Sequence, residues 1–153
     1  MKKRILIVDD DSQICESLRK VLESEGYDVE LAADGHKCLD KFIERRPDLV
    51  LLDLNLPDRS GWDIFGALSS LDPFLPVLMI TGRRDQSGFA KEAGAGALME
   101  KPLDVPLLLK AIATLIAQDP EVHLGRLVGA EPLKENSSED SSPVDERKSG
   151  KRR

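Results

Sequence analysis

Short apolar runs alternate with helical patterns along residues 1–118 of this 153-residue chain, and this alternation constrains the fold more than any other feature. The apolar runs predict five strands, at residues 4–9, 29–33, 49–53, 77–81 and 97–100. The stretches after the strands predict helices. The first helix has Asp11 or Ser12 as its N-cap, and the others cover residues 35–46, 62–70, 85–93 and 104–118. Such alternation indicates parallel βαβ units with right-handed crossovers. We therefore expect an α/β fold, a flavodoxin-like doubly wound five-stranded parallel sheet of order 2-1-3-4-5 with helices on both faces.

Polar side chains stand at the ends of four predicted strands. Asp9 and Asp10 follow the first strand, Asp53 ends the third, Thr81 ends the fourth and Lys101 follows the fifth. The carboxyl ends of parallel strands share one edge, and this strand order makes the first and third strands neighbours, so these groups should converge. Crowded carboxylates repel one another, and a hard divalent cation relieves that repulsion. A carboxylate, a hydroxyl and an ammonium around such a cation form a phosphoryl-transfer site.

Composition narrows the class of protein. A hydrophobic fraction of 41% suffices for a core. The net charge of −6 argues against a nucleic-acid binder, because such proteins are usually basic. Cys15 and Cys38 fall in predicted helices and are expected to be free, buried thiols. No apolar run is long enough to cross a membrane, and the one after Lys2 is too short for a signal peptide, so we expect a cytoplasmic protein without membrane partners.

The chain changes character after residue 118. Residues 1–118 form the predicted domain, and residues 119–133 carry apolar positions that suit a linker, a short packing helix or the remnant of a second domain. Residues 134–153 are almost entirely charged and small polar residues, so we expect a disordered charged tail. Neither segment is long enough for a DNA-binding output domain.

Four short motifs resemble the receiver domain of response regulators in bacterial two-component signal transduction. They are residues 5–11 (ILIVDDD), residues 52–58 (LDLNLPD) followed by Ser60 and Gly61, residues 81–82 (TG) and residues 101–103 (KPL). Each motif alone is a weak signal, but together they stand in the family's order at predicted strand ends. The resemblance covers residues 3–118.

The resemblance implies that Asp53 is the phosphoacceptor. Its carboxylate would take a phosphoryl group from the phosphohistidine of a sensor histidine kinase or phosphotransfer protein, or from a small phosphodonor. Thr81 would donate its hydroxyl to a phosphoryl oxygen, and Lys101 would pair first with Asp53 and then with the phosphoryl group. Such a phosphorelay protein catalyses its own phosphorylation and dephosphorylation and is not a conventional enzyme.

The resemblance also implies a Mg²⁺ cofactor. Asp10 would bind the ion directly, and Asp9 would act through a bound water or from just behind the ligands. Asp53 and the backbone carbonyl of Asn55 would complete the protein ligands. The bond between Lys101 and Pro102 would be cis, as in the family.

Two departures from the family pattern concern signalling output. Leu98 stands where receivers usually carry an aromatic residue that turns inward on activation, and the interval between Thr81 and Lys101 is shorter than usual. Receivers signal through their fourth helix, fifth strand and fifth helix, and an apolar surplus on the fifth helix suggests a homodimer or another partner there. A phosphorylation-independent pseudo-receiver that acts as an interaction module is therefore the alternative.

Two enzyme classes fit less well. A phosphatase of the haloacid-dehalogenase type also uses an aspartate nucleophile, but it requires a second acid where this chain has Asn55. A GTPase is excluded because the chain lacks a glycine-rich loop that ends in Lys-Ser or Lys-Thr.

Overall fold

A computed structural model describes residues 2–82 and 96–128 of the chain. Its strands are β1 Arg4–Val8, β2 Asp28–Ala32, β3 Leu49–Asp53, β4 Val77–Thr81 and β5 Ala97–Glu100. Its helices are α1 Ser12–Ser24, α2 Gly35–Glu44, α3 Gly61–Leu71, α5 Val105–Ala117 and α6 Pro120–Val128. The predicted helix at residues 85–93 and the predicted tail at residues 134–153 lie outside the described residues.

The strands form one parallel sheet of order β2-β1-β3-β4-β5, which confirms the predicted fold class and topology. Every residue of β3 and β4 is buried, as expected for central strands covered on both faces. The register pairs Val8 with Leu52 and Thr81 with Glu100, so the strands end together at one edge. That edge collects the polar residues that follow each strand.

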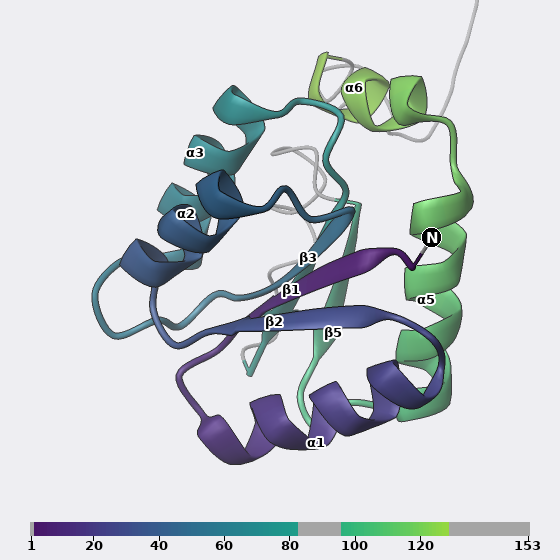
Figure 1. The fold of residues 1–153 in the computed structure, drawn as a ribbon. Coiled ribbons are helices and arrows are strands. Elements are labelled where there is room, and N and C mark those ends of the chain that lie inside the picture. The colour runs from purple at the N-terminus through teal and green to yellow at the C-terminus, as the bar shows by residue number, and fades with distance from the viewer. Residues whose placement is uncertain (1, 83–95, 129–153) are drawn as a thin grey trace, which may run out of the picture.

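Alternate residues of the strands face opposite sides of the sheet and pack in two separate core clusters. Ile5 and Ile7 pack in the cluster that contains residues of α1 and α5, whereas Leu6 and Val8 pack in the cluster that contains residues of α2 and α3. Figure 1 shows α1 and α5 on one side of the sheet and α2 and α3 on the other. Cys15 and Cys38 are buried and free, as predicted. The sheet is thus enclosed on both faces, and its carboxyl edge is left for polar side chains.

A side-chain cap and two backbone conformations explain where α1 begins and where α1 and α2 end. The Asp11 carboxylate accepts the backbone N–H groups of Gln13 and Ile14, so α1 begins at Ser12. Gly26 has a φ of 94° just beyond α1, a conformation that glycine adopts without steric cost. The structure corrects the predicted end of α2, because Arg45 is extended and the helix ends at Glu44.

The segment after α5 folds back as α6. Leu127 of α6 is partly buried and packs against the core cluster beside α2 and α3. The predicted division into a domain at 1–118, a segment at 119–133 and a tail at 134–153 stays a prediction. Among the described residues, no helix is both long enough and apolar enough to cross a membrane.

Candidate functional site

Three carboxylates gather at the carboxyl edge of the sheet. Asp9 and Asp10 follow β1, Asp53 ends β3, and one oxygen of each lies within 4.8 Å of the others. Asp9 and Asp53 are buried, while Asp10 is exposed. The pairing of β1 with β3 causes this convergence, as the predicted strand order required.

Lys101 brings a positive charge into the same edge. Its ammonium nitrogen lies 3.2 Å from Oδ2 of Asp9 and 3.5 Å from Oδ2 of Asp53. Its backbone N–H donates to the carbonyl of Thr81 at 2.8 Å, and the Lys101–Pro102 bond is cis, as expected from the resemblance. Burial alone would lower the pKa of the Lys101 ammonium, but the charges of Asp9 and Asp53 outweigh it and raise that pKa above its ordinary value.

The surroundings of Asp53 disfavour the charged form of its carboxyl group. Burial raises the pKa of the Asp53 carboxyl, and the neighbouring charge of Asp9 raises it further. The backbone N–H of Asn55, which donates to Oδ1 at 3.1 Å, and the Lys101 ammonium oppose this rise without cancelling it. Additional positive charge beside Asp53 would therefore be favourable.

Thr81 and Asn55 complete the predicted set. Thr81 is fully buried at the end of β4, and Asn55 lies exposed in the loop after β3. Both line a cavity of about 350 Å³, together with Asp10 and Trp62. All six residues singled out from the sequence thus lie around one edge of the sheet.

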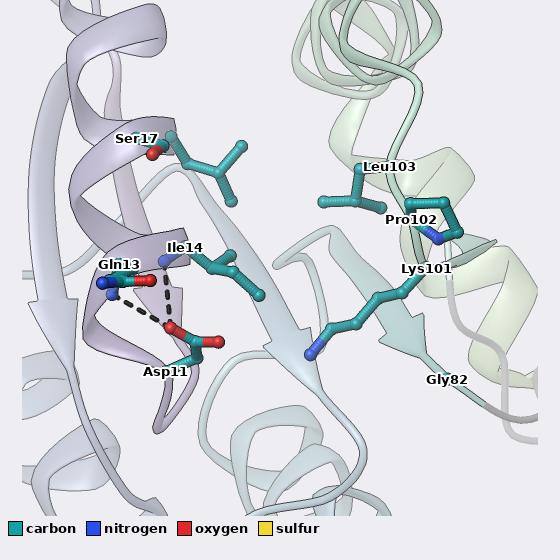
Figure 2. A pocket seen from close by; sticks show the side chains of 9 residues that line it. Asp11, Gln13, Ile14, Ser17, Gly82, Lys101, Pro102 and Leu103 are labelled. Carbon is teal, nitrogen blue, oxygen red and sulfur yellow. Dashed lines mark hydrogen bonds between the residues drawn. The ribbon is translucent and has the colours of Figure 1, made fainter.

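A second pocket, of about 730 Å³, opens beside this edge between α1 and the segment after β5. Figure 2 shows the Lys101 side chain reaching toward α1, with Asp11 opposite it. Gln13, Ile14 and Leu103 also line this pocket. The sequence predicted no place at the site for these three residues, although Leu103 belongs to the motif at residues 101–103, because a pocket wall made by two separate segments leaves no local pattern.

The donor set fits Mg²⁺. Hard divalent cations bind carboxylate and carbonyl oxygens, and the cluster of Asp9, Asp10 and Asp53 supplies three carboxylates at one place. Asn55 is adjacent and can add its backbone carbonyl from the loop. Which of these atoms bind an ion stays a prediction.

Comparison with known proteins identifies the family. The protein-family model described as the response regulator receiver domain matches residues 5–113 of the sequence. The chain belongs to the response regulator receiver family. It is thus a receiver domain of two-component signal transduction. This family assignment excludes a phosphatase of the haloacid-dehalogenase type. Response regulator MprA of Mycolicibacterium vanbaalenii is 40% identical over 118 residues, which are 76% of this chain and 51% of that protein. The receiver thus spans about half the length of the curated relatives it matches.

Solved receivers have the same fold. A CheY-like receiver domain protein from Methanospirillum hungatei is 38% identical, with a TM-score of 0.73 over 76% of this chain and 94% of that one. Response regulator TrrA from Thermotoga maritima, solved with Mg²⁺ and BeF, is 29% identical, with a TM-score of 0.69 over 74% of this chain and 98% of that one.

Proposed function

We propose that this receiver accepts a phosphoryl group on Asp53 from the phosphohistidine of a sensor histidine kinase or phosphotransfer protein, in a reaction that depends on Mg²⁺. The observation that carries the proposal is the buried Asp53 carboxylate, which stands beside two further carboxylates and the Lys101 ammonium. The ion would be held by Asp9, Asp10, Asp53 and the carbonyl of Asn55. The Mg²⁺ and BeF bound to the related TrrA protein support the same reading.

The chemistry follows from the positions of the side chains. An Asp53 carboxylate oxygen attacks phosphorus, a P–O bond forms, and the P–N bond to the donor imidazole breaks. The electron pair of that bond stays on nitrogen, and the ring, already protonated on its other nitrogen, leaves as neutral imidazole. Lys101 moves its charge from Asp53 toward the new phosphoryl oxygens, and the Thr81 hydroxyl donates to one of them. A bound Mg²⁺ would supply further neutralisation of the negative charge that gathers there.

Acetyl phosphate or phosphoramidate with Mg²⁺ tests the phosphoacceptor. The wild-type protein should gain one phosphoryl mass, and Asp53→Asn should gain none. Asp40→Asn is the matched control, because Asp40 is an exposed acid on α2 away from the cluster. Chelation of Mg²⁺ should abolish labelling of the wild type. Equal labelling of Asp53→Asn would place the acceptor elsewhere.

The pseudo-receiver is the second candidate, and Leu98 favours it. This residue is partly buried and packs against the core cluster beside α2 and α3, where the family's usual aromatic ring is missing. A wild-type protein that folds but gains no phosphoryl group from any donor would support this second function.

Output by altered protein contacts is part of the proposal. Leu107 of α5 is 55% exposed, an apolar side chain on the element that receivers use for output. Sedimentation with and without beryllofluoride tests whether the partner is a second copy of the chain. A monomer in both states would exclude the homodimer and leave a different protein partner.

A further inference from the structure

Asp58 joins the loop after β3 to the start of α2. Its Oδ1 accepts the backbone N–H of Gly35 at 2.9 Å, and its Oδ2 accepts that of His36 at 3.0 Å. These are the first two residues of α2, whose N–H groups have no partner within the helix. The Gly35 hydrogen bond, foremost among several effects, lowers the pKa of the Asp58 carboxyl, so the charged form is the one held there.

The same helix has a second, local cap. The Asp34 carboxylate accepts the N–H of Lys37 at 2.8 Å, which is the ordinary N-cap interaction. Asp34 lies next to the helix in sequence, whereas Asp58 comes from another segment. The capping of α2 therefore explains the hydrogen bond of Asp34. The hydrogen bonds of Asp58, which connect two separate segments, suggest an additional role.

The loop that Asp58 belongs to is pinned at its base. Asn55 and Ser60 form an isolated antiparallel bridge, and the N–H of Gly61 donates to the carbonyl of Leu54 at 3.0 Å. Asn55 also donates its N–H to Oδ1 of Asp53. Between these base contacts, Asp58 accepts two hydrogen bonds that hold the far part of the loop to the start of α2.

Gly35 permits this contact. A Cβ built at Gly35 would lie 2.6 Å from Cδ1 of Ile64 and 3.4 Å from Cδ of Arg59. The start of α2 therefore lies closer to α3 and the loop than a residue with a Cβ would allow without a shift of the Ile64 side chain. This approach brings the N–H groups of α2 within reach of Asp58.

We propose that Asp58 is a positioning residue that holds the loop after β3 in place and thereby presents the carbonyl of Asn55 to Mg²⁺. This inference rests on the metal site of the proposed function. Residues that orient a metal ligand contribute to affinity without touching the metal. Asp58 also ties α2 mechanically to the loop that follows the phosphoacceptor.

Matched variants in the full chain test this role by Mg²⁺ titration in a calorimeter. Asp58→Ala should bind Mg²⁺ about tenfold more weakly than the wild type. Asp58→Asn keeps one acceptor oxygen and should be intermediate. Asp34→Ala loses a cap of the same helix but no tie to the loop, so it should bind Mg²⁺ as the wild type does.

Amide hydrogen exchange in the metal-free protein gives an independent measure. Asp58→Ala should speed the exchange of the Asn55 and Gly61 amides severalfold, whereas Asp34→Ala should leave them unchanged. Wild-type Mg²⁺ affinity and exchange in Asp58→Ala would overturn the inference, and so would equal losses in Asp34→Ala. If the alanine variant does not fold, Asp58→Asn decides: weakened Mg²⁺ binding supports the role and unchanged binding overturns it. A wild type that binds Mg²⁺ but is never phosphorylated would overturn only the proposed phosphoryl acceptance.

Discussion

The Lys101 ammonium lies nearer to Asp9 than to Asp53, at 3.2 Å against 3.5 Å. Both carboxylates are buried, with 3% of each side chain exposed, while 28% of the Lys101 side chain is exposed. One partly exposed cation thus serves two buried anions that belong to neighbouring strands. Lys101 holds the acidic edge together as well as facing the predicted phosphoacceptor.

Removal of this ammonium should destabilise the metal-free protein. Lys101→Met leaves Asp9 and Asp53 without their cation and should cost about 1–3 kcal/mol of unfolding free energy. Added Mg²⁺ should restore part of the loss, because it supplies positive charge to the same carboxylates. Urea unfolding with and without Mg²⁺ measures both effects. Lys110→Met, at an exposed position of α5, is the control and should change little; a loss as large in the control would refute the explanation.

Neutralisation of Asp10 should raise the melting temperature of the metal-free protein. Asp10 belongs to a cluster of three carboxylates, and Asp10→Asn removes one like charge without removing bulk. Mg²⁺ should raise the melting temperature of the wild type more than that of the variant, because the variant has lost a charged ligand. Thermal unfolding at several Mg²⁺ concentrations checks both. If the melting temperature follows Mg²⁺ equally in the two proteins, Asp10 is not a ligand.

Two glycines of α3 should respond in opposite directions to alanine. A Cβ at Gly61 would lie 2.6 Å from the carbonyl oxygen of Asp53 and 2.6 Å from Cα of Leu54, so Gly61→Ala must displace backbone at the proposed phosphoacceptor. We expect a loss of about 1–3 kcal/mol and slower labelling by acetyl phosphate. A Cβ at Gly66 meets nothing within 4 Å, so Gly66→Ala should gain up to about 1 kcal/mol from helix propensity and keep its labelling rate. Loss of stability in both variants would contradict the contact argument.

The two cysteines should resist alkylation while the protein is folded. Burial, reinforced by nearby acids, raises the pKa of Cys15 from 9.0 to about 11 and that of Cys38 from 9.0 to about 12. The reactive thiolate is therefore scarcer at pH 8 than in the unfolded chain, by on the order of a hundredfold or more. Its fraction should rise only as the pH approaches these raised values. Timed iodoacetamide labelling, with and without urea, checks this; rapid labelling of the folded protein would contradict it.

Truncation separates α6 from the tail that follows it. Leu127 packs against the core, so a chain that ends at Gln118 should unfold at a lower temperature than the full chain. A chain that ends at residue 133 should match the full chain in melting temperature and in phosphorylation by acetyl phosphate. Equal stability of all three chains would show that α6 adds nothing to the core.

The sequence by itself predicted the sheet order and the acidic edge. Apolar runs of strand length, each followed by a helical pattern, leave few topologies. The order β2-β1-β3-β4-β5 is the flavodoxin-like arrangement that five such units fit. Once β1 and β3 are neighbours, Asp9, Asp10 and Asp53 must approach one another. These conclusions depend on patterns that are local in the chain, and that is why sequence alone could reach them.

Only the tertiary structure decided the contacts between distant segments. The sequence paired Lys101 with Asp53, but its position between Asp9 and Asp53 depends on how β5 pairs with β4. The hydrogen bonds from Asp58 to the start of α2 join residues more than 20 positions apart, and they form where Gly35, which has no side chain, packs closely against Ile64. A distance of a few ångströms between side chains depends on packing of the whole domain, and no short window of sequence contains that information.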